Sequence, residues 1–166
     1  MKFERENIPS FEKDILKRVH GLEIDYPALS LVSNIFRVAN GFRNHAEKRL
    51  LGNFGLSFSG FTVLWVLWVW GPQEPARLAH EAGISKATLT GVLKTLESLE
   101  FTAREPHRTD GRKIVIRLTN QGKTTFRKLL PRFNSLESAV TADLSEPLKT
   151  ELTGALRTIL RATQEK

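Results

Sequence analysis

Cysteine is missing from this sequence of 166 residues, and tyrosine and methionine each occur once. Without cysteine, disulfide bonds, thiolate zinc ligands and thiol redox chemistry are excluded. The longest apolar run, residues 61–70, is too short to cross a bilayer as a helix, which takes about 20 residues. The first ten residues also lack the apolar stretch of a signal peptide. We therefore expect a cytoplasmic protein with no membrane partner.

Signatures of catalysis are missing as well. The chain contains no G-x-S-x-G elbow, no H-E-x-x-H pair and no glycine-rich phosphate loop. Its four histidines show no metal-ligand spacing. We accordingly expect no enzymatic reaction, no cofactor and no bound metal.

Acidic residues make up the smaller share of the charge. There are 18 Asp and Glu residues against 25 Lys and Arg residues, which leaves a formal net charge of +7 and a pI near 10.0. Such a balance favours a polyanionic partner, either nucleic acid or an acidic membrane surface. Apolar residues still make up 40% of the chain, so we expect a folded core rather than a disordered chain.

Apolar residues recur at helical spacing toward both ends of the chain. They predict helices over about residues 8–22 and 28–51, and two more that begin near Thr119 and after Ser145. Residues 61–70 form a continuous apolar string rich in Val and Trp, which fits either a buried strand or a buried helix. The sequence thus predicts a mainly α-helical protein.

The middle of the chain has the pattern of a helix-turn-helix. Pro75 can begin a short helix, Gly83 permits the turn, and Ser85 is a good N-cap for the next helix. That second helix has an apolar stripe from Leu89 to Leu99 and small or basic residues on its other face. A short helix, a turn containing glycine and a second helix in this order are typical of the helix-turn-helix.

Two short strands are predicted after this unit, at residues 102–105 and 113–118, around an arginine-rich turn. Residues 101–117 carry five Lys or Arg against two Asp or Glu. A basic hairpin that directly follows a helix-turn-helix predicts the wing of a winged helix.

Three segments resemble the MarR family of bacterial transcriptional regulators. The segment DGRKIVIRLT (Asp110–Thr119) is similar to the wing signature of that family, which is D-x-R followed five residues later by L-T. LAHEAGIS (Leu78–Ser85) and ATLTGVLKTLESLEF (Ala87–Phe101) look like the two helices of its helix-turn-helix. Two positions depart from the pattern: Gly91 stands where many relatives have a long polar or basic residue, and Glu100 replaces a glycine.

The resemblance implies a homodimer with two winged helix-turn-helix lobes that binds double-stranded DNA. It implies a repressor of pseudo-palindromic operators that a small ligand releases, and a buried helix at residues 61–70. In these terms, residues 1–52 are N-terminal dimerisation helices and residues 56–118 are the DNA-binding lobe with a two-stranded wing. Residues 119–166 are then C-terminal dimerisation helices.

Ten residues are predicted at the DNA interface. The N-terminal part of the second helix would enter the major groove, and an arginine on a narrow hairpin can reach the minor groove. Arg112 is the leading candidate, while Asp110 is expected to fix the hairpin by accepting backbone or arginine hydrogen bonds. The alternative is an ordinary solvated surface. The predicted residues are Ser85, Lys86, Thr88, Thr90 and Lys94 on the helix, and Arg104, Arg108, Asp110, Arg112 and Lys113 on the wing.

An effector site could be lined by aromatic residues and a histidine, and would suit an aromatic or lipophilic anion. Aromatic residues at helical spacing are more often part of a core. Two other functions stay open: a winged helix that binds protein without salt-dependent DNA affinity, and a carrier or enzyme that uses the tryptophan-rich region regardless of DNA. The candidate effector residues are Phe36, His45, Phe61, Trp65 and Trp68.

Overall fold

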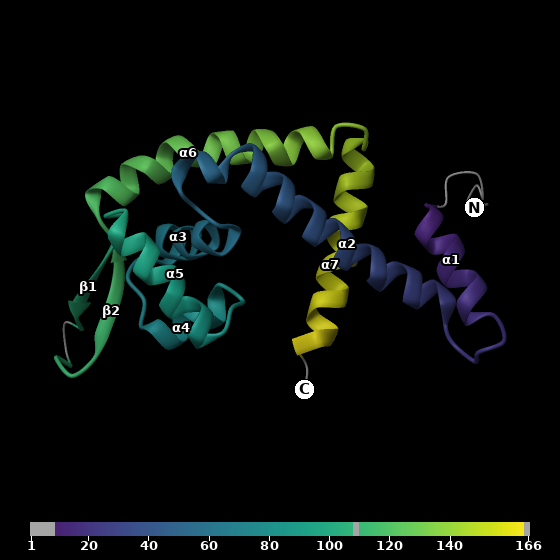
Figure 1. The fold of residues 1–166 in the computed structure, drawn as a ribbon, viewed down its shortest axis with the longest axis horizontal. Coiled ribbons are helices and arrows are strands. Elements are labelled where there is room, and N and C mark those ends of the chain that lie inside the picture. Colours follow the sequence, from purple (N-terminus) through teal and green to yellow (C-terminus); the bar gives the residue numbers. More distant parts are fainter. Residues whose placement is uncertain (1–8, 108–109, 165–166) are drawn as a thin grey trace. The chain divides into compact units, whose positions relative to one another are not determined.

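The computed structural model describes residues 9–107 and 110–164, and the chain divides into two compact units, Met1–His45 and Ala46–Lys166. Helices dominate, and two strands form one antiparallel sheet (Figure 1). The predicted mainly α-helical fold with a two-stranded wing is confirmed. The elements are α1 (Ser10–Val19), α2 (Tyr26–Arg49), the 3-10 helix η2 (Leu51–Phe54), α3 (Phe58–Trp70), α4 (Pro75–Glu81), α5 (Lys86–Ser98), β1 (Thr102–Pro106), β2 (Ile114–Leu118), α6 (Asn120–Val140) and α7 (Glu146–Gln164).

The first unit contains α1 and most of α2. Glu12 of α1 ties the two helices together, because its carboxylate accepts hydrogen bonds from Ser30 Oγ at 2.9 Å and from Asn34 Nδ2 at 2.7 Å. The guanidinium carbon of Arg37 lies 3.4 Å from the centre of the Phe11 ring. Several large apolar side chains of this unit stay exposed, so the pair of helices buries little apolar surface by itself.

The apolar run at residues 61–70 is a helix, as the family resemblance implied, and it is buried along most of its length but exposed at Trp65, Val69 and Trp70. α3 begins after Ser57, whose Oγ accepts a hydrogen bond from the Gly60 N–H at 3.1 Å. Val63 and Leu64 have no exposed surface. A helix that is apolar on all sides belongs in the interior of a domain, and α3 contacts α4, α5, α6 and β2.

The helix-turn-helix is formed by α4 and α5, as predicted. Pro75 is the first residue of α4, and Gly83 in the turn has a φ of +64°, which glycine adopts without strain. Ser85 caps α5 by accepting a hydrogen bond from the Thr88 N–H at 3.0 Å. The predicted inward stripe is buried at Leu89, Leu93 and Leu96, which leaves the opposite face of α5 exposed.

The end of α5 is a Schellman motif with an unusual residue in it. The Phe101 N–H donates to the Leu96 carbonyl at 2.9 Å, and the Glu100 N–H donates to the Glu97 carbonyl at 3.0 Å. Glu100 has a φ of +57°, the one positive φ among the described residues other than glycine. The helix therefore ends where a glycine would end it, with a side chain that opposes this backbone conformation.

The wing is an antiparallel hairpin in which Thr102 pairs with Leu118 and Pro106 with Ile114. Its strands agree with the predicted ones to within one residue at each end. Gln73, in the loop before α4, adds a bridge to β2, since it exchanges both backbone hydrogen bonds with Ile116 at 3.0 and 2.8 Å. This bridge anchors the base of the wing to the helix-turn-helix.

α6 begins where the chain leaves the wing. Thr119 caps the helix by accepting a hydrogen bond from the Gly122 N–H at 2.9 Å. Gly122 packs so closely on the preceding turn that a Cβ there would lie 2.0 Å from the Phe101 carbonyl oxygen. The helix then continues through Pro131 to Val140.

α7 is amphipathic but has no buried residue. A stripe of four leucines at a spacing of four residues is between 40 and 56% exposed. The four leucines are Leu148, Leu152, Leu156 and Leu160.

In the described part of the chain, no helix has the length and apolarity needed to cross a membrane.

Candidate nucleic-acid interface

The N-terminal half of α5 presents an exposed polar surface. The hydroxyls of Ser85 and Thr88 lie 2.8 Å apart, and Thr90 Oγ1 donates a hydrogen bond to the Lys86 carbonyl at 3.0 Å. Neither Lys86 nor Lys94 has an ion pair within residues 9–107 and 110–164. Lys86 thus offers an ammonium group without an ion pair among the described residues in the first turn of α5, where the positively polarised helix N-terminus favours an anion, and Lys94 offers a second one two turns further along.

The tip of the wing is held in shape by its own backbone and by Asp110. The Asp110 carboxylate accepts a hydrogen bond from the Arg112 N–H at 3.1 Å, as expected, and the Asp110 carbonyl accepts one from the Lys113 N–H at 2.9 Å. The Arg112 side chain is exposed and makes no ion pair with a described residue. The remaining predicted tip residue, Arg108, lies outside the described residues.

Each of the other wing cations that the structure describes is paired with a carboxylate. These pairs join different elements, and all of their side chains are partly exposed, so each pair is worth little in stability. To bind a phosphate, such a cation must break the ion pair with its carboxylate or contact both groups at once. The pairs are Arg104 Nε with Glu97 at 2.6 Å, Lys113 Nζ with Glu74 at 2.9 Å, and Arg117 with Glu105.

The carboxylate of Glu74 stabilises the charged form of Lys113. The hydrogen bond to Glu74 and the negative charge of that residue raise the pKa of Lys113 above its ordinary value. The ammonium group is therefore charged throughout the neutral range.

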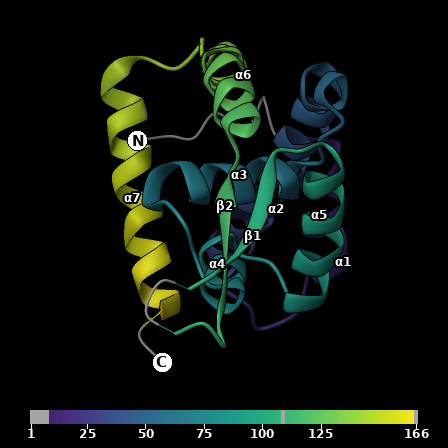
Figure 2. The same cartoon turned by 90° about the vertical axis from the view of Figure 1, so that its left-hand side faces the viewer.

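The wing and α5 belong to the same side of the second unit. Figure 2 shows β1 between β2 and α5, and α5 contacts β1. A recognition-type helix therefore lies beside the wing hairpin, and among the described residues neither Lys86 and Lys94 of the helix nor Arg112 of the hairpin has an ion-pair partner. Two such elements side by side can engage adjacent grooves of duplex DNA.

Comparison with known proteins identifies the family. Residues 56–114 match the family model described as MarR family. YwaE, an HTH-type transcriptional regulator of Bacillus subtilis, is 33% identical over 144 residues, which cover 87% of this chain and 84% of YwaE. This chain belongs to the MarR family.

Two further comparisons agree. YetL, an HTH-type transcriptional repressor of Bacillus subtilis, is 34% identical over 128 residues, which cover 76% of each chain. The structure of AbsC, a MarR family regulator from Streptomyces coelicolor, matches with a TM-score of 0.75 at 23% identity, over 86% of this chain and 98% of AbsC. The MarR protein described here is therefore a DNA-binding transcriptional regulator.

One departure from the family pattern lies in the middle of α5, within the candidate interface. Gly91 is exposed in the middle of α5, and a Cβ added there would meet nothing within 4 Å. The MarR regulator therefore has open space where many relatives project a long side chain. Ser85, Lys86 and Thr88 are exposed polar residues at the N-terminal end of α5.

The five residues predicted to line an effector site are divided between the two units. Phe36 and His45 belong to the first unit, where Phe36 is 65% exposed. Phe61 is a buried core residue that stacks on a phenylalanine of α6 with 3.9 Å between ring centres. Trp65 is 39% exposed, and Trp68 is half-buried. A joint role of these five residues in ligand binding stays a prediction.

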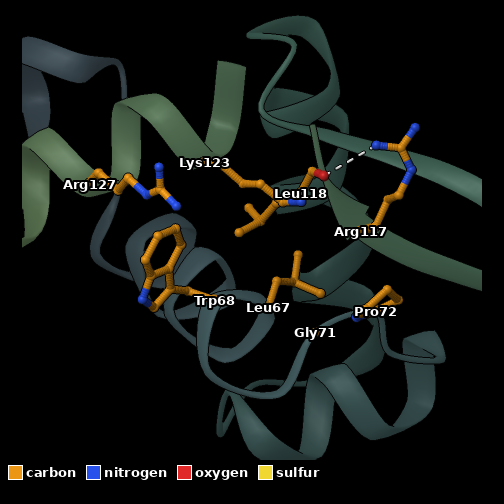
Figure 3. A pocket seen from close by; sticks show the side chains of 8 residues that line it. All are labelled: Leu67, Trp68, Gly71, Pro72, Arg117, Leu118, Lys123 and Arg127. Atoms are coloured by element: carbon orange, nitrogen blue, oxygen red, sulfur yellow. Dashed lines mark hydrogen bonds between the residues drawn. The ribbon is translucent and has the colours of Figure 1, made fainter. Parts of the chain in front are cut away.

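A cavity of about 330 Å³ in the second unit contains Trp68 but is otherwise lined by residues that the sequence did not single out. Figure 3 shows it between the end of α3, the end of β2 and the first turns of α6. Three cations line it: Arg117, Lys123 and Arg127. The spacing of four residues between Lys123 and Arg127 was an available signal, because it puts two like charges on one helix face.

Metal binding finds no support in the described residues. No group of three or more His, Asp or Glu side chains among them could hold a metal ion. The chemistry available to this MarR regulator on the described surface is that of cations, hydroxyls and aromatic rings.

Proposed function

We propose that this MarR regulator is a homodimeric repressor that binds a pseudo-palindromic operator and leaves it when a small aromatic or lipophilic ligand binds. The observation that carries the proposal is the position of the exposed N-terminal face of α5 beside the wing hairpin (Figure 2). We assign the chain no catalytic reaction and place its action in the cytoplasm.

DNA binding would use the two elements differently. The first turns of α5 enter the major groove, where Ser85 and Thr88 meet bases or phosphates and Lys86 meets phosphates. Arg112 reaches from the wing tip into the minor groove, where narrow A·T-rich segments concentrate negative potential. In a dimer, two α5 helices about 34–36 Å apart reach successive major grooves on one side of the duplex.

Dimerisation is supported by apolar surface that this chain alone leaves uncovered. The leucine stripe of α7 is at least 40% exposed at every position, and α2 exposes Leu31 and Phe36. Large exposed apolar patches on regulatory proteins mark contact surfaces. A second copy would cover them, as the family resemblance implies.

Repression and ligand control are supported by relatives. YetL is named a transcriptional repressor. A structural neighbour at 20% identity and a TM-score of 0.68 is Bordetella bronchiseptica BpsR, whose DNA binding is regulated by 6-hydroxynicotinic acid. Another, at 18% identity and a TM-score of 0.74, is an organohalide-sensing regulator in its 2,4-dichlorophenol bound form. A ligand can release this chain from DNA only by binding the DNA-incompetent arrangement more tightly.

An electrophoretic shift with the upstream region of the regulator's own gene tests DNA binding. Arg112→Ala should weaken binding at least about tenfold, because each lobe loses a groove contact. Arg132→Ala removes the same charge from an exposed site on α6, about 18 Å along the helix from its start, and should change affinity less than about twofold. Equal affinity of the Arg112→Ala variant and the unaltered protein would contradict the wing assignment.

Light scattering on the purified chain tests the dimer. Leu152→Glu puts a charge in the middle of the α7 stripe and should shift the protein toward the monomer, because burying an unpaired charge is costly. Glu151→Gln, the neighbouring exposed residue, should leave a dimer. A monomer in the unaltered protein would contradict the proposed assembly.

A further inference from the structure

Gly91 weakens the helix to which it belongs. Glycine inside a helix is less stable than alanine, because its backbone loses more conformational entropy on folding. The φ of Gly91 is not positive, and a Cβ added there would meet no described neighbour within 4 Å. Gly122 is the contrast, since a Cβ there would lie 2.0 Å from the Phe101 carbonyl oxygen. Among the described residues nothing prevents alanine at position 91, where it would stabilise α5.

The position of Gly91 on α5 is the outermost one. Two residues along a helix correspond to a rotation of about 200°, so Gly91 points away from Leu89 and Leu93, which are buried. Ala87, four residues earlier, and Ser98, seven residues later, share its face and are exposed. All three have small side chains, so the backbone of α5 itself lies close to the surface along this line.

The surface is also hollowed beside Gly91. A cavity of about 270 Å³ lies between α5 and the segment that leads into α3, and none of the described residues that line it is charged. Its lining includes Gly55, Ser57 and Gly60 on one side, and Gly91 and Thr95 on the other. No bulky or charged side chain therefore keeps a partner away from the backbone of α5 at this point.

We propose that Gly91 lets the backbone of α5 lie directly against the base edges of the major groove, and that this close approach puts the Ala87 methyl group on the 5-methyl group of a thymine. The inference rests on the proposed function, in which α5 enters the major groove. In that arrangement the outermost line of the helix is the part nearest to the bases. A Cβ at position 91 would hold the helix away from them, so the glycine that destabilises the free protein increases contact in the complex.

The chemistry of this line favours thymine over the other bases. Thymine presents a methyl group in the major groove, whereas the other three bases are read there through hydrogen-bonding groups. Ala87 has no side-chain donor or acceptor, and neither has Gly91, so this part of α5 cannot form the bidentate hydrogen bonds that select guanine or adenine. Longer polar side chains stand on both flanks of the line, where phosphates come within reach. They are Lys86, Thr90 and Lys94 on one flank, and Thr88 and Thr95 on the other.

A duplex selected from a random pool by the unaltered full chain provides the probe, and fluorescence anisotropy measures its affinity. Gly91→Ala should weaken binding at least about tenfold, because the added methyl group overpacks the contact with the bases. The same substitution should raise the melting temperature of the protein by about 2–4 °C. A variant that is more stable and yet binds DNA more weakly cannot owe the loss to misfolding.

The matched control is Gly154→Ala on α7. Gly154 is also exposed inside a helix, and a Cβ there would likewise meet nothing within 4 Å. It lies about 200° around the helix from Leu152 and Leu156 of the leucine stripe. Gly154→Ala should therefore raise the melting temperature by a similar amount and change DNA affinity less than about twofold.

Deoxyuridine tests the thymine contact, because it lacks only the 5-methyl group. Replacing the thymines of one half-site in turn should identify a position at which the unaltered protein loses about fourfold in affinity, the amount expected for one buried methyl group. With Ala87→Gly, the same replacement should have no effect. Comparing the two duplexes within each protein cancels any effect of Ala87→Gly on the stability of α5.

Two results would overturn this inference alone: DNA affinity unchanged by Gly91→Ala, or no deoxyuridine effect that depends on Ala87. If the unaltered chain selects no duplex at all, the proposed function fails and this inference fails with it. Weaker binding by Gly91→Ala, unchanged binding by Gly154→Ala and a deoxyuridine effect that disappears in Ala87→Gly would together support the close approach.

Discussion

The ion pair between Glu74 and Lys113 offers a sharp test of how the wing meets DNA. Glu74 precedes α4, Lys113 precedes β2, and their charged atoms are 2.9 Å apart. Glu74→Gln removes the competing carboxylate and leaves an amide of similar shape. It frees one ammonium group per lobe, and therefore two in a dimer, for contact with phosphates.

The size of the effect follows from counterion release. Each phosphate contact steepens the dependence of log K on log salt by about 0.9. If each lobe of the unaltered dimer neutralises about four phosphates, the slope is about −7, and two more contacts bring it to about −9. Because the pair is exposed on both sides, at 52 and 41%, it competes only weakly with DNA. We expect DNA affinity at low salt to rise several-fold.

Fluorescence anisotropy with a labelled operator, over a range of salt concentrations, measures both quantities. The control is Glu146→Gln, which breaks a similar pair with Lys149 at 2.8 Å on α7 and changes the net charge by the same amount. It should leave the slope unchanged. If Glu74→Gln neither tightens binding nor steepens the slope, Lys113 does not reach DNA and the wing contacts must be assigned elsewhere.

The effect of Glu74→Gln on the stability of the fold should not depend on pH in the neutral range. Glu74 raises the pKa of Lys113, so the folded protein binds this proton more tightly than the unfolded chain does. Any stabilisation from the pair is complete below the unfolded pKa, about 10.4, and is lost only as the pH rises through the higher folded value. Thermal unfolding of the unaltered protein compared with Glu74→Gln, between pH 6 and pH 11, should show the difference between them fading only at the alkaline end.

Four other substitutions, at three positions, have different expected effects on stability and DNA binding. Glu100→Gly should raise the free energy of unfolding, measured by chemical denaturation, by about 1 kcal/mol. The left-handed conformation costs a residue with a side chain about 1–2 kcal/mol, and the greater conformational entropy of glycine in the unfolded chain offsets part of this gain. Gly122→Ala should lower it by about 3 kcal/mol or prevent folding, since its Cβ would lie 2.0 Å from the Phe101 carbonyl oxygen; an unchanged melting temperature would contradict the packing at the start of α6. Ser85→Asp should keep the α5 cap and the melting temperature while weakening DNA binding, whereas Ser85→Ala should cost about 1 kcal/mol of stability; equal DNA affinity of the aspartate variant would remove Ser85 from the interface.

Local signals in the sequence were enough to predict the helix-turn-helix and the wing. Pro75, Gly83 and Ser85 act through their own backbone or cap geometry, so their meaning does not depend on distant residues. The apolar run at residues 61–70 was ambiguous for the opposite reason. A helix that is apolar on every side has no polar face to reveal its period, and the family resemblance was needed to identify it as a helix.

The carboxylate partners of the wing cations were beyond the reach of sequence pattern. Glu74 and Lys113 are 39 residues apart, and only the docking of the Gln73 loop onto β2 brings them together. The cationic cavity is similar, because β2, α3 and α6 each contribute part of it. In both cases the chemistry depends on tertiary contacts between elements whose own formation the sequence did predict.

The ion pairs of the wing reduce the part of the net charge of +7 that is free to bind DNA. Of the wing cations that the structure describes, Arg104, Lys113 and Arg117 already form ion pairs with carboxylates, and Arg112 does not. When one of the first three binds DNA, it exchanges a carboxylate for a phosphate. The free energy gained is therefore only the difference between the two ion pairs. Arg112 gives up no ion pair with a described residue when it binds DNA. The hydrogen bond from its N–H to the Asp110 carboxylate already fixes the backbone there, so binding costs less backbone conformational entropy. A single arginine at the tip should therefore contribute more to affinity than the three paired cations behind it.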